Sequence, residues 1–134
     1  MIYGSIEAGG TKFVCAIGDE EMTIKERVSF PTTTPEETMP LVIDFFKQYQ
    51  ADLAGIGIGS FGPIDIHRDS ATYGYITSTP KLAWQNFDFI GTMKKEFPIP
   101  ISWTTDVNAA AYGEYVFGSG KGLSSVVYYK IGRA

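Results

Sequence analysis

The fold is decided by the opening stretch Ile2-Tyr3-Gly4-Ser5-Ile6-Glu7-Ala8-Gly9-Gly10-Thr11-Lys12-Phe13-Val14-Cys15-Ala16-Ile17. Its two halves, residues 2–6 and 13–17, are rich in β-branched and aromatic residues and flank a small-residue turn, which is the pattern of a β-hairpin. A third segment of the same kind, residues 24–30, follows the polar stretch 18–21. The sequence therefore predicts three consecutive hairpin-connected strands.

A capped helix is predicted after these strands. Thr34-Pro35-Glu36-Glu37 supplies a hydroxyl cap, a proline at the first helical position and a glutamate three residues after the cap. Apolar residues then recur at helical spacing and form one stripe: Leu41, Val42, Phe45, Phe46 and Tyr49. Pro40 lies inside this pattern and removes one backbone hydrogen bond, so we expect the helix to kink or restart there.

The rest of the chain alternates strands and helices. Residues 53–61 form an apolar run punctuated by glycines, which is typical of a central strand that another backbone or a ligand approaches closely. Residues 66–87 have no sustained period and predict an ordered excursion with a short strand near 73–76. The remaining elements are expected as a helix at 89–97, a strand at 101–105, a third helix from Asp106 or Val107 toward Gly118, and a strand at 125–131.

This order predicts an α/β fold in which a mixed sheet carries helices on both faces. Ligands of such sheets gather at the carboxyl ends of the strands. Two polar stretches fall at predicted strand ends, residues 7–12 and residues 106–110. They are therefore the first candidates for a functional site.

Composition limits the kinds of partner that are expected. Of the 134 residues, 44% are apolar and 14% aromatic, which is ample for one buried core. The single Cys15 excludes an intramolecular disulfide, and the single His67 excludes a Cys/His metal cluster. The net charge of -4 disfavours nucleic acid and anionic membranes. No leader precedes Glu7 and no apolar run is long enough to span a bilayer, so we expect a soluble, cytoplasmic protein.

The turn between the first two strands could hold a phosphate. At Gly9 and Gly10 the missing side chains let backbone amides approach an anion, and Thr11 and Lys12 add a hydroxyl and a cation. The alternative is a tight hairpin turn that needs positive backbone angles. The segment is not a Walker loop, because the required spacing to Gly-Lys-Ser/Thr is absent.

The exit of the strand at 101–105 could supply a general base. Asp106 follows this strand and precedes a helix, so its carboxylate would be held rigidly at the sheet edge, with Asn108 close behind. The alternative is an aspartate that only caps the amides of the helix.

Other polar residues carry weaker signals. Glu7 could hold Mg²⁺ through water or could simply be solvated. Asp65 could pin a loop over a sugar site or could be an ordinary turn residue. A polar and aromatic patch could contact a polyol, although exposed loops often have this composition; it contains Thr77, Ser78, Thr79, Lys81 and Trp84.

Four motifs in order resemble the ROK family of bacterial sugar kinases, and most closely its fructokinase branch. They are Ile6-Glu7-Ala8-Gly9-Gly10-Thr11-Lys12-Phe13, Gly57-Ile58-Gly59-Ser60-Phe61-Gly62-Pro63-Ile64-Asp65, Thr79-Pro80-Lys81 before Trp84, and Thr105-Asp106-Val107-Asn108-Ala109-Ala110-Ala111 before Gly113-Glu114. The resemblance covers the whole chain. It implies an actin-like ATPase domain with a ribonuclease-H-like sheet.

The resemblance also implies a reaction, the ATP-dependent phosphorylation of a hexose. Asp106 would take the proton from the attacking hydroxyl, Gly9, Gly10, Thr11 and Lys12 would lie near the ATP phosphates, and Mg²⁺ would bridge phosphate oxygens. The sugar site would include Asp65, Thr79, Lys81, Thr105, Asp106 and Asn108. Glucose-specific relatives tend to carry Asn at the positions of Lys81 and Thr105, so fructose is the expected sugar and fructose 6-phosphate the product. Glucose or another hexose is the alternative substrate.

Family members continue beyond this chain with a second domain that holds a Cys/His zinc cluster. We therefore expect residues 1–118 to form the N-terminal kinase domain and residues 119–134 to begin a truncated second domain. The full-length enzyme is expected to be a homodimer, and the isolated chain to be inactive or to survive as a sugar-binding fragment. Repressors of the same family carry a DNA-binding module ahead of the turn, and only six residues precede Glu7 here, so that branch is not expected.

Overall fold

The computed structural model describes residues 1–19 and 23–105. The third helix expected from Asp106 or Val107 and the strand expected at 125–131 lie outside these residues. The elements of the described part are β1 (Ile2–Ala8), β2 (Lys12–Asp19), β3 (Ile24–Pro31), α1 (Pro35–Lys47), β4 (Leu53–Ser60), β5 (Tyr75–Ile76), a 3₁₀ turn (Leu82–Trp84), β6 (Phe87–Asp88), α2 (Phe89–Glu96) and β7 (Ile101–Thr105).

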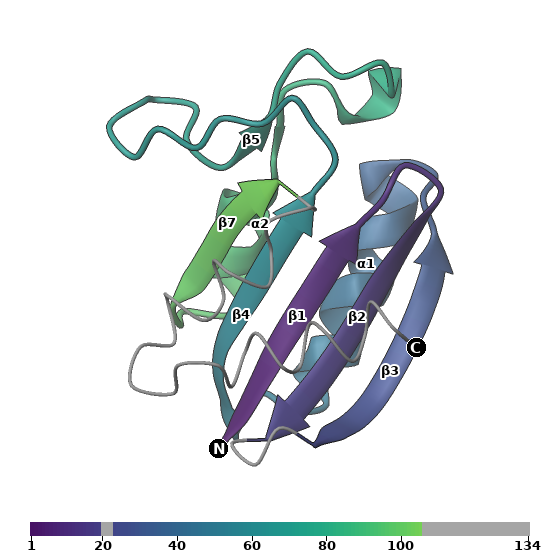
Figure 1. Cartoon of the computed structure of the whole chain (residues 1–134), viewed down its shortest axis with the longest axis vertical. Helices are drawn as coiled ribbons and strands as arrows, with labels where there is room; N and C mark the ends of the chain where they lie inside the picture. The colour runs from purple at the N-terminus through teal and green to yellow at the C-terminus, as the bar shows by residue number, and fades with distance from the viewer. Residues whose placement is uncertain (20–22, 106–134) are drawn as a thin grey trace.

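Five strands form one mixed sheet in the order β3-β2-β1-β4-β7 (Figure 1). β1, β2 and β3 pair antiparallel as two successive hairpins, which confirms the predicted three-stranded start. β4 and β7 add parallel to β1 on its other side. The carboxyl ends of β1, β4 and β7 therefore meet at one edge of the sheet.

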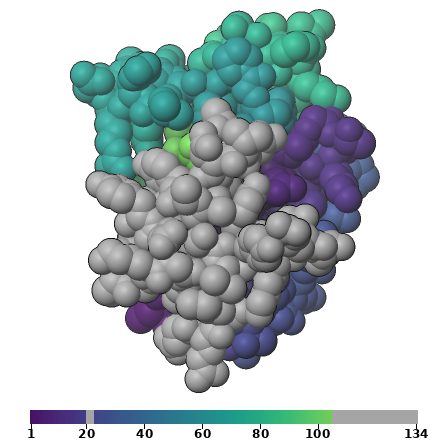
Figure 2. Space-filling model, in the orientation of Figure 1, coloured from purple at the N-terminus to yellow at the C-terminus, as the bar shows by residue number. Residues whose placement is uncertain are grey.

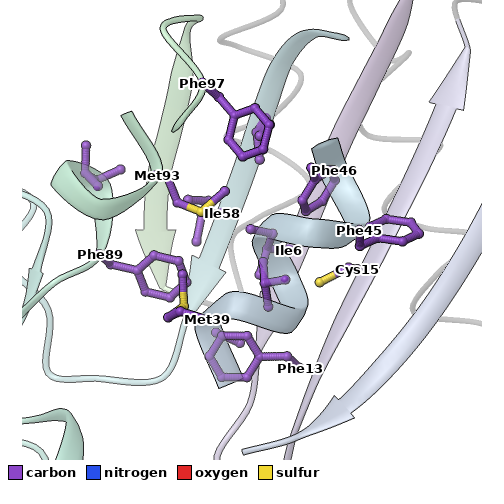
Figure 3. Packing of buried hydrophobic residues seen from close by; sticks show 14 of the residues in the cluster. Ile6, Phe13, Cys15, Met39, Phe45, Phe46, Ile58, Phe89, Met93 and Phe97 are labelled. Carbon is purple, nitrogen blue, oxygen red and sulfur yellow. The ribbon is translucent and has the colours of Figure 1, made fainter. Parts of the chain in front are cut away.

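Both described helices cover the same face of the sheet, and the core lies between them and the strands (Figures 1 and 3). Ile6 and Ile58 from the sheet are buried in one cluster with Phe46 of α1 and Met93 of α2. Side chains alternate along a strand, so every second residue of β1 and β4 belongs to this core. The helix expected on the opposite face lies outside the described residues.

Helix α1 begins where the capping signal predicts. The Thr34 hydroxyl accepts a hydrogen bond from the backbone N–H of Glu37 at 3.3 Å. The helix runs without interruption through Pro40, so the expected restart does not occur, and the expected kink stays a prediction. Proline has no N–H, so one backbone carbonyl in the preceding turn loses its helical partner, but Pro40 is exposed and water can reach that carbonyl. Buried residues on both sides of Pro40 keep the helix packed on the sheet.

Helix α2 follows β6 directly. The Asp88 carboxylate caps it by accepting a hydrogen bond from the N–H of Gly91 at 2.8 Å. Ile90, Met93 and Phe97 are buried, as the helical spacing predicted. No helix of the described residues is both long and apolar enough to cross a membrane.

The segment between β4 and α2 is the ordered excursion that the sequence predicted. Its two short strands β5 and β6 pair antiparallel, and Ile64 bridges to Ile76. Gly74, with φ of +88°, packs against Ile90, where a Cβ would lie 2.6 Å from that side chain. In Figure 2 the excursion stands as a teal-to-green block above the end of the sheet. It thus overhangs the edge where the parallel strands end.

Candidate functional site

The register places three strand ends in one row. Ala8 of β1 pairs with Ser60 of β4, and Ser60 pairs with Thr105 of β7. Neighbouring strands are about 4.8 Å apart, so the backbones of Ala8 and Thr105 are roughly 10 Å from each other. The chain leaves this row at Gly9 on one side and at Asp106 on the other. Asp106 and Asn108 themselves lie outside the described residues, and their predicted roles are untested.

The bend after β1 is tight at Gly9. A Cβ on Gly9 would lie 2.9 Å from the carbonyl oxygen of Lys12, closer than real contacts allow. The bend is a tight hairpin turn, as the alternative predicted, but neither Gly9 nor Gly10 has a positive φ, so the expected positive angles were wrong. The space available to the backbone, rather than the sign of φ, requires glycine at position 9.

The hydrogen bonds of the bend leave amide donors free. The Gly9 N–H donates to the Lys12 carbonyl at 3.0 Å. The carbonyls of Gly9 and Thr11 both accept from Thr32, from its hydroxyl at 2.8 Å and from its N–H at 2.9 Å. Within residues 1–19 and 23–105, the N–H groups of Gly10 and Thr11 have no partner. Two adjacent free donors on an exposed bend are suited to an anion.

Two lysines from separate segments flank this bend. Lys12 is exposed and lines a shallow hollow of about 250 Å³ together with Arg27, Val28 and Ser29. Lys81 comes from the excursion, and its Cε lies 3.5 Å from the position that a Cβ on Gly10 would occupy. The excursion therefore brings a second ammonium group, that of Lys81, to the bend. The sequence analysis had assigned Lys81 only to the sugar site.

Glu7 is half-buried on the sheet face opposite the helices, because its neighbours Ile6 and Ala8 face the core. The described residues contain no group of three or more His, Cys, Asp or Glu side chains that could hold a metal. A magnesium ion here would therefore take at most two carboxylates from the described residues and complete its shell with water and phosphate oxygens, an arrangement that Mg²⁺ accepts.

Asp65 organises the tip of the excursion. Its carboxylate accepts from the Ser70 hydroxyl at 2.6 Å, the Thr72 hydroxyl at 2.5 Å and the His67 N–H at 2.9 Å. These hydrogen bonds, led by that from Ser70, lower the pKa of Asp65 from its ordinary 3.8 to about 2. Its backbone carbonyl accepts from the indole N–H of Trp103 in β7 at 2.9 Å. The geometry therefore favours the role of pinning the loop.

The predicted polyol patch is only partly exposed. Trp84 is fully buried against Phe13, with ring centroids 5.3 Å apart, so its inclusion in a ligand-contacting patch was wrong. Thr79 is 1% exposed, and its hydroxyl accepts from the N–H of Lys81 at 3.2 Å. In this structure Thr79 shapes the turn that presents Lys81.

Sequence reasoning missed Thr32. It follows Pro31, the last residue of β3, and no motif marks it. The available signal was the hairpin itself, because a strand that pairs with β2 must end beside the bend where β2 begins, and Lys12 does pair with Pro31.

Comparisons with known proteins identify one matching family and several relatives. The model of the ROK family matches residues 3–134. The chain is 61% identical over 131 residues to a fructokinase of Streptococcus mutans, covering 98% of this chain and 44% of that protein. It is 54% identical over 132 residues to a fructokinase of Pediococcus pentosaceus, covering 98% and 45%. The chain thus spans less than half the length of these relatives, and it corresponds to their N-terminal part.

A solved structure supports the same fold. The chain resembles a ROK family glucokinase from Streptomyces griseus in complex with glucose and AMPPNP, with a TM-score of 0.66 and 26% identity, covering 91% of this chain and 38% of that one. The predicted actin-like α/β fold is thereby confirmed.

Proposed function

The chain belongs to the ROK family, and from this premise we propose that it carries the phosphate-binding and proton-accepting part of an ATP-dependent hexose kinase site. The observation that supports this most is the common edge of the sheet. The free amides of the bend and the end of β7, after which Asp106 follows, leave from one row of paired residues. Phosphoryl transfer needs mainly such positioning and charge neutralisation.

On this proposal the bend binds the phosphates of ATP. The N–H groups of Gly10 and Thr11 donate to phosphate oxygens, and the ammonium groups of Lys12 and Lys81 neutralise their charge. Gly9 is needed because a side chain there would collide with the Lys12 carbonyl. Mg²⁺, when bound, would supply further charge neutralisation at the phosphate oxygens, and Glu7 is the carboxylate nearest the bend in sequence that could orient its waters.

Asp106 accepts the proton of the sugar hydroxyl as that oxygen attacks the terminal phosphorus of ATP, the bond from this phosphorus to the bridging oxygen breaks, and ADP leaves. A base fixed at a strand end can be held within hydrogen-bond reach of the hydroxyl without reorganising. Thr105 and Asn108 flank it as sugar contacts. Asp65 and Thr79 act by shaping the excursion over the sugar, whereas Lys81 contacts the ligand directly.

Fructose is the proposed sugar. The relatives named fructokinase reach 61% identity, whereas the glucokinase of known structure is 26% identical. Lys81 and Thr105 also differ from the asparagines expected in glucose-specific relatives. We further propose a cytoplasmic, homodimeric enzyme whose zinc cluster lies outside these 134 residues.

A chimera tests the proposal. This chain would replace the matched N-terminal part of the Streptococcus mutans fructokinase, and phosphorylation of fructose and glucose by ATP would be measured. We expect turnover with a preference for fructose, and little or none from the 134 residues alone. A folded chimera without kinase activity, or one that prefers glucose, would contradict the proposed function or the proposed sugar, respectively.

A further inference from the structure

Three consecutive threonines join β3 to α1, and each bonds a different part of the molecule. The Thr34 hydroxyl caps α1. The Thr33 carbonyl accepts from the indole N–H of the buried Trp84 at 2.9 Å. Thr32 bonds the bend through both its hydroxyl and its N–H. The linker therefore connects the bend, the excursion and the first helix.

The two bonds from Thr32 decide which groups of the bend are free. Both go to carbonyl oxygens, those of Gly9 and Thr11, at 2.8 and 2.9 Å. A carbonyl oxygen that faced a phosphate would repel it, whereas an N–H attracts it. The Gly9 carbonyl and the Gly10 N–H belong to one planar, trans peptide and point in opposite directions, so the Thr32 hydroxyl that holds this carbonyl also turns the Gly10 N–H away from the linker. The Thr11 N–H shares its peptide with the Gly10 carbonyl, to which Thr32 makes no bond.

The linker is itself held rigidly enough to fix the bend. The Thr38 hydroxyl of α1 donates to the Pro31 carbonyl at 3.1 Å and accepts from the N–H of Thr33, also at 3.1 Å. Trp84, which bonds Thr33, packs between the rings of Phe13 and Phe61. Thr32 thus reaches the bend from a backbone that is anchored on both sides.

We propose that Thr32 is a positioning residue for phosphate binding: its hydroxyl holds the Gly9 carbonyl toward the linker and so keeps the N–H of Gly10, in the same peptide, turned toward the anion. This inference rests on the proposed function of the bend. Thr32 does not touch the phosphate. Its hydroxyl acts through the Gly9 carbonyl.

Substitutions that keep the shape of the side chain test this role. Thr32→Val removes the hydroxyl, and Thr32→Ser retains it. Thr92→Val is the matched control, because the Thr92 hydroxyl also donates to a backbone carbonyl, that of Asp88 at 2.7 Å, but in α2. The affinity of the 134-residue chain for sodium tripolyphosphate would be measured by calorimetry, and folding by circular dichroism.

We expect Thr32→Val to weaken tripolyphosphate binding by about fivefold or more, which corresponds to one lost hydrogen bond. Thr32→Ser and Thr92→Val should bind within about twofold of the unmodified chain. A purely structural role for Thr32 predicts instead that Thr32→Val and Thr92→Val lose stability alike and keep the same affinity. Should Thr32→Val fail to fold, Thr32→Ala, which adds no methyl group, is expected to show the same loss of affinity.

Two different outcomes would overturn the inference. Equal binding by the unmodified chain and by folded Thr32→Val would refute the positioning role and leave the phosphate site standing. No binding by the unmodified chain would refute the phosphate site itself, and the role of Thr32 with it.

Discussion

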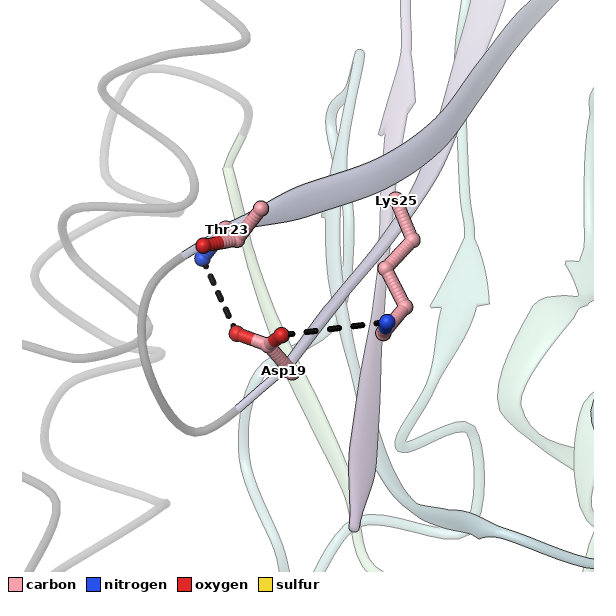
Figure 4. A network of polar contacts seen from close by, with 3 residues as sticks. All are labelled: Asp19, Thr23 and Lys25. Carbon is pink, nitrogen blue, oxygen red and sulfur yellow. Dashed lines mark hydrogen bonds and ion pairs between the residues drawn. The ribbon is translucent and has the colours of Figure 1, made fainter.

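The β1–β2 bend and the β2–β3 turn lie at opposite ends of the same three strands, and they satisfy their backbone groups in opposite ways. At the β2–β3 turn the Asp19 carboxylate accepts from the N–H of Thr23 at 3.0 Å and lies 3.9 Å from the ammonium of Lys25 (Figure 4). That turn is bonded by its own side chains. The bend at Gly9 is held from outside by Thr32, which bonds only its carbonyls.

On the proposed function, one meander combines a structural turn with a binding turn. At the β2–β3 turn the Asp19 carboxylate occupies the N–H of Thr23, and its negative charge repels an anion. A bend supported through its carbonyls keeps its donors available. Glycine at positions 9 and 10 also keeps side chains away from those donors.

The largest expected effect comes from removing the proposed base, Asp106. In the fructokinase chimera, Asp106→Asn should lower kcat roughly 10²- to 10⁴-fold, because the amide cannot accept the proton of the sugar hydroxyl. Binding of tripolyphosphate should change less than about twofold, since the bend is untouched. Steady-state kinetics and calorimetry measure the two effects separately. A variant that keeps its kcat would remove Asp106 from the mechanism.

The second-largest expected effect is a loss of folding stability that differs between the two glycines of the bend. Gly9→Ala should lower the free energy of unfolding by about 1–3 kcal/mol, because its Cβ would lie 2.9 Å from the Lys12 carbonyl. Gly10→Ala is the matched control, because its Cβ would make only an ordinary 3.5 Å contact with Lys81. Urea unfolding measures both. Equal destabilisation would mean that close packing at Gly9 does not define the bend.

A smaller effect is expected from replacing Asp65, whose carboxylate accepts hydrogen bonds from its own loop, as the carboxylate of Asp19 does in the β2–β3 turn. Its pKa of about 2 lies below the ordinary 3.8, so its stabilising effect is complete above about pH 4 and is lost as the pH falls through 2. The melting temperature of Asp65→Asn should therefore lie below that of the unmodified chain at pH 5, and the two should converge near pH 2. Calorimetric scans across this range measure the difference. A gap that does not change with pH would show that the carboxylate charge is not what holds the loop.

The smallest effect is expected at the β2–β3 turn. Asp19→Ala should lower the free energy of unfolding by about 1 kcal/mol or less, because its hydrogen bond with Thr23 is exposed and its ion pair with Lys25 is long. Tripolyphosphate binding should not weaken, since this turn lies at the other end of the strands. A loss of binding as large as that of Thr32→Val would contradict the division of roles between the two turns.

Much of the fold could be predicted from the sequence because local signals agreed with the tertiary structure. β7 begins at Ile101 and ends at Thr105 as expected, between the prolines that stop the preceding segment and the polar residues that follow. The Thr34 cap likewise fixed the start of α1. The expected restart at Pro40 does not occur, because buried residues on either side hold the helix on the sheet and local propensity takes no account of them.

The site was harder to predict because its support comes from distant segments. The burial of Trp84 depends on Phe13, Phe61 and Phe87, which no local pattern brings together. The role of Thr32 depends on the register of β3 against β2. Sequence could mark the glycines of the bend, but not the carbonyl bonds that leave its amides free.

The most direct measurement is an NMR titration of the ¹⁵N-labelled chain with sodium tripolyphosphate. The account predicts that the amide resonances of Gly10 and Thr11 shift most and saturate together, while that of Thr23, in the β2–β3 turn, stays in place. Unchanged Gly10 and Thr11 resonances at saturating tripolyphosphate, or equal shifts at Thr23, would contradict the claim that this bend is the phosphate site.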